Sequence, residues 1–353
     1  MKFNNRSVRK AAVGATVVAA SGVVLACAAA VGAGAAYFAV RNLRRLRLDG
    51  RVVVITGGSR GLGLAMARKL LRRGSKVALL ARNADELERA KVQLRNDSVR
   101  TYICDVRDQE QVNQTIAEIS AVLGTIDVLV NNAGTITVGP MDSMRMEEYR
   151  EALEVYFWGP LHTTLAVLPE MRRRRSGRIV NISSIGGKIS VPHLLPYSVG
   201  KFALAGFSEG LRTELAAENI FVTTVFPGLM RTGSPRNAEF KGNSEAEYTW
   251  FLMSDATPGL SISADRAARQ IVHACELGKS ELIVSLPAKI AIKLHGVFPG
   301  LTIPALTAMT RLLPAAKYAP DRKKKGSESQ TGITRSWLTT LDQKAAVKNN
   351  QIV

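Results

Sequence analysis

The chain has 353 residues, of which 46% are hydrophobic, and its formal net charge is +19. This apolar content can fill a sizeable core, which excludes a chain that is disordered throughout. The three cysteines are too few for a disulfide framework, and the four histidines lack metal-ligand spacing, so no metal is expected. The length exceeds one α/β domain by roughly a hundred residues, which lie at the two ends.

The basic residues cluster beside apolar sequence. Eight Lys and Arg residues stand against one Asp within residues 1–50, and a basic run occupies 322–325. Such clusters suit an anionic lipid surface, where each charge gains about 1 kcal/mol. No basic stretch is interleaved with aromatic residues, so the sequence predicts no nucleic-acid partner.

The N-terminal region contains a long apolar segment. No charged residue occurs from Ala11 to Val40, and about twenty apolar residues suffice to cross a bilayer. We therefore expect residues 1–47 to be a single-pass transmembrane anchor. A removable signal peptide is the alternative, because Lys2 to Lys10 form a basic n-region and Cys27 ends a loose lipoprotein-like sequence.

A glycine-rich turn follows the anchor. Residues 51–56 form a β-branched run, and residues 64–73 have apolar positions at helical spacing. A turn between a strand and a helix brings backbone N–H groups up to a pyrophosphate, and glycines allow its close approach. A tight turn without a ligand is the alternative. The turn contains Thr56, Gly57, Gly58, Ser59, Arg60, Gly61, Leu62 and Gly63.

The end of the second predicted strand, Lys76 to Ala81, indicates which dinucleotide would bind. An acidic residue there would accept the ribose hydroxyls, but this chain has Ala81 followed by Arg82, with Arg60 in the glycine turn. Two arginines at that corner would bind a phosphomonoester, which favours NADP(H) over NAD(H). Two solvated surface arginines are the alternative.

Three residues downstream form a candidate catalytic group. Tyr197 and Lys201 are four residues apart, which places both side chains on one face of a helix. The ammonium group would lower the pKa of the phenol and make Tyr197 a proton donor or acceptor near neutral pH. With Ser184 holding a carbonyl, these residues predict a hydride-transfer enzyme.

From about residue 50 to 290 these motifs together resemble the classical short-chain dehydrogenase/reductase family. The glycine turn is similar to its TGxxxGxG motif, and Asn131 to Gly134 is similar to its NNAG segment. The resemblance implies that Ser184, rather than Ser183, is the family's serine. It also implies further cofactor contacts at Asp105, Val106, Asn132, Ala133, Gly134, Tyr197, Lys201, Pro227, Gly228 and Thr232.

One position departs from the family pattern. The family commonly has an asparagine on the helix after NNAG that helps to hold a water in the proton relay to the lysine, and Tyr156 aligns there. We expect slower or altered catalysis. A catalytically impaired, membrane-bound NADP-binding scaffold or sensor is therefore the alternative function.

The remaining pattern predicts the domain organisation. Strand-like runs alternate with helical stretches, which predicts a Rossmann-like, doubly wound parallel sheet with helices on both faces over residues 48–286. Residues 287–320 form an apolar extension that is too broken by Pro and Gly to span a bilayer; a membrane-lying or pocket-capping segment and a helix packed on the domain are the two options. Residues 321–353 are polar and expected to be disordered. The strand-like runs begin at Arg51, Lys76, Val99, Ile126, Arg178, Ile220 and Glu281.

These features predict an enzyme that interconverts a carbonyl and a hydroxyl group on a lipophilic substrate, with a role in lipid metabolism. Basic residues flank the anchor on both sides, so charge does not orient it. The supply of NADPH places the catalytic domain on the cytoplasmic face, and export would remove the enzyme from its cofactor. The sequence is compatible with a homo-oligomer and does not decide the oligomeric state.

Overall fold

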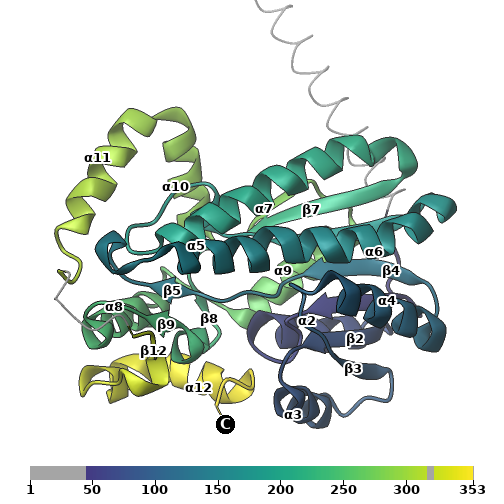
Figure 1. The fold of residues 1–353 in the computed structure, drawn as a ribbon, viewed down its shortest axis with the longest axis horizontal. Helices are drawn as coiled ribbons and strands as arrows, with labels where there is room; N and C mark the ends of the chain where they lie inside the picture. The colour runs from purple at the N-terminus through teal and green to yellow at the C-terminus, as the bar shows by residue number, and fades with distance from the viewer. Residues whose placement is uncertain (1–44, 316–321, 353) are drawn as a thin grey trace, which may run out of the picture. The chain divides into compact units, whose positions relative to one another are not determined.

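Residues 45–315 and 322–352 are described by the computed structural model, so the predicted anchor at 11–40 lies outside the described residues. The unit that begins at Arg47 is built on a seven-stranded sheet in the order β11-β7-β6-β4-β1-β2-β3 (Figure 1). All its pairings are parallel. The strands are β1 (Val52–Thr56), β2 (Lys76–Ala81), β3 (Val99–Ile103), β4 (Ile126–Asn131), β6 (Gly177–Ile182), β7 (Ile220–Phe226) and β11 (Glu281–Ile283).

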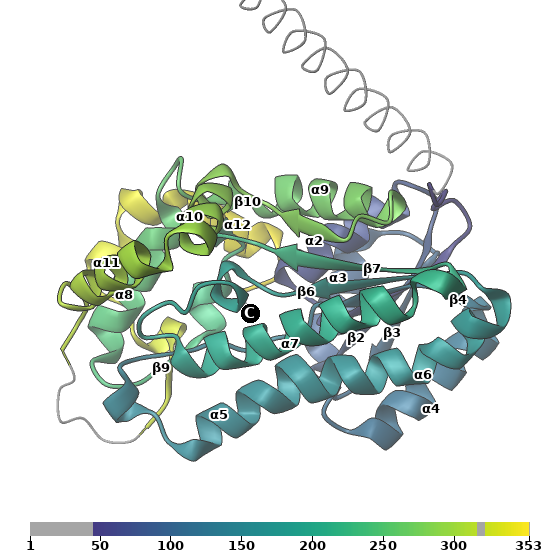
Figure 2. The same ribbon diagram turned by 90° about the horizontal axis from the view of Figure 1, so that it is seen from above.

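Helices cover both faces of this sheet, which confirms the predicted Rossmann-like α/β fold. Helices α2 (Gly61–Leu71) and α9 (Ala264–Glu276) pack together on one face (Figure 2). The other face carries α4 (Gln109–Leu123), α6 (Gly159–Arg174) and α7 (Leu195–Glu214). Helix α3 (Ala84–Leu94) packs beside β2 and β3.

The burial of the strands explains their composition. Every residue of β1, β4, β6 and β7 is buried, as expected for strands covered on both faces, whereas the edge strands β3 and β11 have exposed positions. The main apolar core lies between the sheet and the helices that cover it, with Leu129, Ile179 and Met171 fully enclosed. This core keeps the carboxyl ends of the strands in one row.

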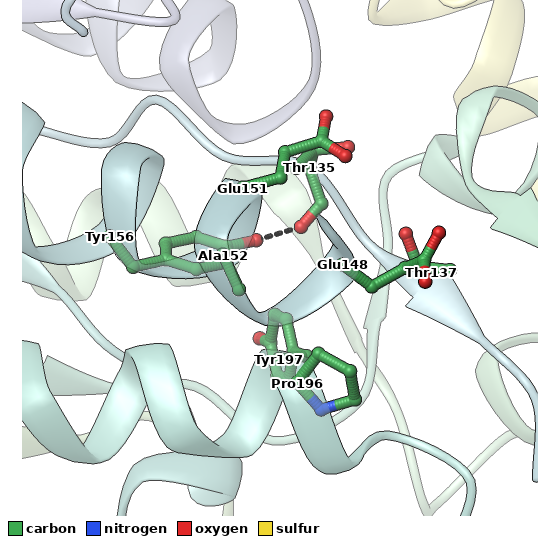
Figure 3. A pocket seen from close by; sticks show the side chains of 8 residues that line it. All are labelled: Thr135, Thr137, Glu148, Glu151, Ala152, Tyr156, Pro196 and Tyr197. Carbon is green, nitrogen blue, oxygen red and sulfur yellow. Dashed lines mark hydrogen bonds between the residues drawn. The ribbon is translucent and has the colours of Figure 1, made fainter. Parts of the chain in front are cut away.

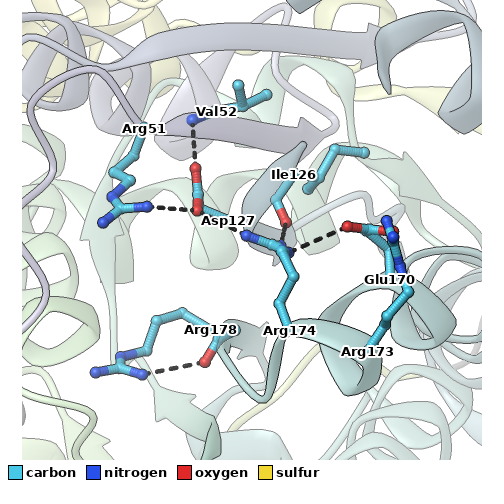
Figure 4. A network of polar contacts seen from close by, with 9 residues as sticks. Arg51, Val52, Ile126, Asp127, Glu170, Arg173, Arg174 and Arg178 are labelled. Carbon is cyan, nitrogen blue, oxygen red and sulfur yellow. Dashed lines mark hydrogen bonds and ion pairs between the residues drawn. The ribbon is translucent and has the colours of Figure 1, made fainter. Parts of the chain in front are cut away.

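A polar network joins the opposite, amino-terminal edge of the sheet (Figure 4). The Asp127 carboxylate at the start of β4 accepts hydrogen bonds from the Val52 backbone N–H at 3.1 Å and from Arg51 at 3.0 Å. Arg174 at the end of α6 donates to the same carboxylate at 3.2 Å and to the Ile126 carbonyl at 2.7 Å. The network ties α6 to β1 and β4 at the edge away from the carboxyl ends.

Smaller elements follow the carboxyl ends of the main strands. Strands β5, β9 and β12 form a three-stranded sheet, and β8 pairs with β10. Helices α5 and α8 complete this part, and π-helix η2 joins α5 to α6. Their bounds are β5 (Thr137–Val138), η1 (Met141–Ser143), α5 (Met146–Leu153), η2 (Glu154–Trp158), η3 (Ile185–Gly187), β8 (Met230–Arg231), η5 (Ser234–Asn237), β9 (Glu239–Phe240), α8 (Ser244–Ala256), β10 (Ile262–Ser263) and β12 (Lys324–Lys325). A further short helix, η4 (Ala216–Glu218), precedes the start of β7 instead.

The apolar extension forms two helices, α10 (Leu286–Val297) and α11 (Pro299–Thr310), which pack on each other (Figure 1). Ala288 is the one residue buried on either helix. Leu301 is 70% exposed and Leu312, just beyond α11, is 85% exposed. In the part of the chain that the structure describes, no helix has both the length and the hydropathy needed to cross a membrane.

The prediction of a disordered tail is wrong for residues 322–352. This segment adds β12 to the small sheet and ends in α12 (Thr340–Lys348), which packs against α8. Ser329, Thr339 and Ala346 are fully buried. Composition misled the prediction because the polar side chains of this segment find hydrogen-bond partners on the domain, so that burying them costs little.

Candidate active site

The glycine turn between β1 and α2 has the geometry that its sequence predicts. Gly57 and Gly61 have φ values of +62° and +59°, which side chains rarely adopt. A Cβ on Gly63 would lie 2.3 Å from the Gly57 carbonyl oxygen, so only glycine fits there. The turn therefore presents the start of α2 without side chains in the way, which suits a dinucleotide phosphate.

The NNAG segment is tied directly to this turn. The Asn132 amide donates to the carbonyl oxygens of Thr56 at 3.1 Å and Gly57 at 3.0 Å. In return, the Thr56 hydroxyl oxygen accepts from the backbone N–H groups of Asn132 and Ala133 at 2.9 and 3.0 Å. These bonds place the predicted cofactor residues of two strands side by side.

The corner at the end of β2 contains an acidic residue that the sequence analysis missed. The Glu86 carboxylate accepts from the Ser59 hydroxyl at 2.9 Å and pairs with Arg60 at 3.1 Å. Arg82 is exposed at the same corner, with its charge acting on Asp105. Arg60 and Arg82 thus face different carboxylates in this structure, and no local sequence signal singled out Glu86.

Ser184 lies where the resemblance implies. Its hydroxyl oxygen accepts the Gly186 N–H at 3.0 Å, and it hydrogen-bonds the Tyr197 phenol. Ser183 points elsewhere and donates to the Lys201 carbonyl oxygen at 2.9 Å. The choice between the two neighbouring serines therefore agrees with the structure.

Tyr197 and Lys201 both lie on α7, but their protonation differs from the expectation. Burial raises the pKa of Tyr197 to about 12, although its hydrogen bond with Ser184 acts in the opposite direction. Burial also lowers the pKa of Lys201 to about 7. The Lys201 ammonium donates to the Ile182 carbonyl oxygen at 2.7 Å. The expected lowering of the tyrosine pKa is thus wrong, because burial dominates both groups.

Tyr156 stands directly beside this pair. The Lys201 Nζ atom lies 3.9 Å from the centre of the Tyr156 ring, compared with 5.7 Å from the centre of the Tyr197 ring. The two tyrosine rings meet edge to face, with centroids 5.5 Å apart. The Tyr156 hydroxyl donates to the Thr135 carbonyl oxygen, next to a cavity of about 10 Å³ that has room for about one water (Figure 3).

The loop after β7 completes the carboxyl-end cluster. The Pro227 carbonyl oxygen accepts the Ile185 N–H at 2.8 Å, which holds the Pro227-Gly228 turn beside the Ser184 segment. The Thr232 hydroxyl donates to the Ser234 hydroxyl oxygen at 2.9 Å. The structure thus brings all the predicted motifs to one edge of the sheet.

A second polar group, made by His193, Glu247 and Trp250, lies beside the loop that precedes Tyr197. His193, which has a φ of +61°, contacts the Glu247 carboxylate through Nδ1 at 2.8 Å. The Trp250 indole donates to the other oxygen of Glu247 at 2.6 Å. The side chains of His193 and Glu247 are nearly fully buried and that of Trp250 is partly buried, so this group supports the loop that precedes Tyr197.

The short chain dehydrogenase family matches residues 51–241. The chain belongs to this family. A Dehydrogenase/reductase SDR family protein 7-like from Drosophila melanogaster is 33% identical, over 73% of this chain and 79% of that protein. One of the same name from Anopheles gambiae is 38% identical, over 56% of this chain and 64% of that protein. The 3-dehydrosphinganine reductase of Danio rerio is 35% identical, over 52% of this chain and 57% of the fish protein.

Solved structures show the same fold. A short-chain dehydrogenase from Streptomyces avermitilis has a TM-score of 0.65 and 30% identity, covering 74% of this chain and 97% of its own. A gluconate 5-dehydrogenase from Burkholderia cenocepacia in complex with NADP and tartrate has a TM-score of 0.60 and 28% identity, covering 70% and 98%. An L-sorbose reductase from Gluconobacter frateurii complexed with NADPH and L-sorbose has a TM-score of 0.59 and 27% identity, covering 67% and 95%.

Proposed function

We propose that this short-chain dehydrogenase is an NADP(H)-dependent oxidoreductase that interconverts a carbonyl and a hydroxyl group on a lipophilic substrate. The observation that carries the proposal is the contact of Ser184 with Tyr197, with Lys201 on the same helix, beside the glycine turn. A serine and a tyrosine hydroxyl that converge on one point can bind a carbonyl oxygen and donate a proton to it.

The chemistry divides between the cofactor and this chain. When bound, the dinucleotide supplies the hydride to the carbonyl carbon or accepts it from the alcohol carbon. The Ser184 hydroxyl orients the substrate oxygen, and in reduction the Tyr197 hydroxyl gives that oxygen its proton. Since the pKa of Tyr197 is about 12, the phenol is protonated at neutral pH and ready to act as the acid in reduction. Alcohol oxidation requires its deprotonated form and is expected to gain from rising pH.

NADP(H) is favoured by residues at the adenosine corner. Arg82 is exposed at the end of β2, where a 2′-phosphate would lie, and no acidic residue occupies position 81. Two neighbours in structure were solved with NADP or NADPH, which supports the same choice. Arg60 would reach the phosphate only by exchanging its bond to Glu86, so Arg82 is the stronger candidate.

Attachment to a membrane is also part of the proposal. The uncharged segment 11–40 supports a single-pass anchor, with the catalytic domain on the cytoplasmic side where NADPH is available. Leu286 and Val297 on α10 are 68% and 67% exposed, and Lys289 and Lys293 on the same helix supply positive charge. A lipid surface would cover these apolar side chains and leave the lysines at the headgroups.

A lipophilic substrate fits this membrane address. The resemblance to a relative named for 3-dehydrosphinganine supports a long-chain ketone or alcohol.

One observation supports a second candidate function, an NADP-binding scaffold or sensor with impaired turnover. Tyr156 fills the position of the family's relay asparagine, and its ring covers Lys201. A lysine whose pKa is near 7 carries less charge to stabilise a tyrosinate than an ordinary lysine does.

The deciding experiment compares wild type with Tyr197→Phe in two assays. We expect both proteins to bind NADPH, and turnover of lipophilic ketones and aldehydes to fall by on the order of 10² or more in the variant. Equal turnover by both proteins across the whole panel, with NADPH binding intact, would favour the scaffold. Tighter binding of NADH than of NADPH by the wild type would reject the cofactor choice.

A further inference from the structure

The C-terminal segment lies on the glycine turn. The Asn349 carbonyl oxygen accepts the Gly61 N–H at 2.9 Å, the amide that opens α2. The Asn350 side-chain amide donates to the carbonyl oxygens of Ser59 and Glu86, both at 2.9 Å. Asn349 and Asn350 are 2% and 4% exposed, so these bonds are shielded from water.

The same two asparagines also accept hydrogen bonds from the domain. Arg68 on α2 donates to the Asn349 side-chain oxygen at 3.1 Å, and Arg89 on α3 donates to that of Asn350 at 3.1 Å. The Asn350 amide is therefore held through both its donor and its acceptor atoms by residues more than 250 positions away in sequence. A segment that rested loosely on the surface would not be held in this way.

Helix α12 contacts the loop that follows β7. The Gly233 N–H donates to the Asp342 carboxylate at 3.2 Å, and a Cβ on Gly233 would lie 2.3 Å from the Ala346 Cα atom. The Asn349 amide also reaches the Thr232 carbonyl oxygen at 3.5 Å. The segment thus runs from the glycine turn to the loop that follows Pro227-Gly228.

A bound dinucleotide needs the groups that this segment uses. Its pyrophosphate binds at the N-terminus of the helix after the glycine turn, where the Gly61 N–H is given to Asn349. A Cβ on Gly61 would lie 2.9 Å from the Gln351 side-chain nitrogen, so this side chain occupies the space beside the Gly61 amide.

We propose that residues 340–352 are an internal ligand of the proposed cofactor site, which binds in competition with NADP(H) and leaves the site before the cofactor binds. The proposal rests on the cofactor binding proposed above. Displacement replaces the hydrogen bonds of Asn349 and Asn350 with those of the dinucleotide. The measured affinity for NADP(H) is therefore the affinity of the undocked protein multiplied by the fraction of molecules whose segment is undocked.

A substitution of Asp342 should strengthen docking of the segment, whereas loss of Asn349 and Asn350 should weaken it. The Asp342 carboxylate is buried and interacts with Asp255 on α8, and the positive charges of Arg231 on β8 and Arg236 on η5 act on it in the opposite direction. Burial raises the pKa of Asp342 to about 6, so docking at neutral pH buries a charge that is costly to hold. Asp342→Asn keeps an acceptor for the Gly233 N–H and removes that charge.

The test measures NADPH binding to the full-length chain by titration calorimetry at pH 7.5. We expect Asn349→Ala/Asn350→Ala to lower the Kd at least tenfold, because it removes five side-chain hydrogen bonds of the docked state. Asp342→Asn should raise the Kd. Val347→Ala is the matched control, since this side chain of the same segment is 64% exposed, and its Kd should equal that of the wild type.

Hydrogen exchange gives a second, independent measurement. Saturating NADPH should increase exchange at the amides of α12 in the wild type, because the segment is displaced. A double variant with unchanged or weaker NADPH binding, or an α12 that becomes better protected with NADPH, would overturn the inference and make the segment part of the cofactor site. If neither wild type nor any variant bound NADPH, the proposed function would fail and the inference with it.

Discussion

Tyr156 is the residue through which the proposed active site departs from the pattern of the family. Its ring face receives the Lys201 ammonium at 3.9 Å, a cation–π contact that is worth about 2 kcal/mol or more where water is excluded. Gly134 and Gly200 make room for the ring, since a Cβ on either would lie within 3.0 Å of it. The surroundings are therefore shaped for tyrosine, and the substitution is built into the fold around Lys201.

A substitution series at Tyr156 should separate its ring from its hydroxyl. Tyr156→Phe keeps the ring over Lys201 and loses the bond to Thr135, so kcat should change by less than about threefold while stability falls by roughly 1 kcal/mol. Tyr156→Asn should raise kcat, because it opens space for a relay water near Lys201. Steady-state kinetics with thermal melting checks both, and a lower kcat in Tyr156→Asn with an unchanged melting temperature would contradict the relay argument.

Lys201 should make stability depend on pH. Its pKa is about 7 when folded and about 10.4 when unfolded, so above pH 7 the unfolded chain binds more protons and stability rises with pH up to about 10. Lys201→Met removes the cost of burying the charge. Without cofactor it should be more stable than the wild type at pH 6, by on the order of a few kcal/mol, and this advantage should shrink by pH 10.

The measurement is denaturant unfolding of both proteins at several pH values. Loss of the bond to the Ile182 carbonyl lowers the stability of Lys201→Met by about 1 kcal/mol at every pH, so the trend with pH is the informative quantity. A stability difference that stays constant from pH 6 to 10 would show that Lys201 keeps an ordinary pKa in the folded protein.

At the scale of elements, the two edges of the sheet have different roles. The carboxyl edge carries the proposed site, whereas the Asp127 network at the amino edge joins α6, β1 and β4 (Figure 4). Because the carboxylate accepts from a buried backbone N–H and from two arginines, its loss leaves all three without that partner.

Asp127→Ala should therefore destabilise the fold by about 2–4 kcal/mol, while Asp127→Asn, which keeps an acceptor for the Val52 N–H, should cost about half as much. Urea unfolding measures both. NADPH affinity and kcat of the folded variants should match the wild type, since the network lies at the far edge from Tyr197. An altered kcat at full folding would show that the two edges are coupled.

At the scale of the whole molecule, α10 and α11 offer an apolar surface with little cover from the described residues. The chain beginning at Leu48, which lacks the proposed anchor, should still bind vesicles that contain phosphatidylserine. Leu294→Glu/Leu301→Glu should weaken this binding at least tenfold, because both side chains are about half exposed or more, at 48% and 70%.

Val122→Glu is the control for that experiment. Val122 is 56% exposed and lies on α4, a helix that covers one face of the main sheet. Vesicle sedimentation measures the three proteins. Equal binding by the double variant would reject α10 and α11 as a membrane surface. Release of the full-length chain from membranes by high salt would reject the anchor at 11–40.

Local sequence patterns by themselves determined the parallel sheet, the glycine turn and the spacing of Tyr197 and Lys201. These features depend on neighbouring residues: strands covered on both faces are continuously apolar, a tight turn needs Gly57 and Gly61, and four residues make about one helical turn. For the same reason, all seven predicted strand positions appear in the sheet.

Only the tertiary structure decided how the site is arranged. The pKa values of Tyr197 and Lys201 depend on how deeply the fold buries them, which no local pattern expresses. The polar tail was expected to be disordered because its composition lacks a core. Its buried asparagines instead find partners on the glycine turn and α3, and contacts between residues so distant in sequence exist only once the chain has folded.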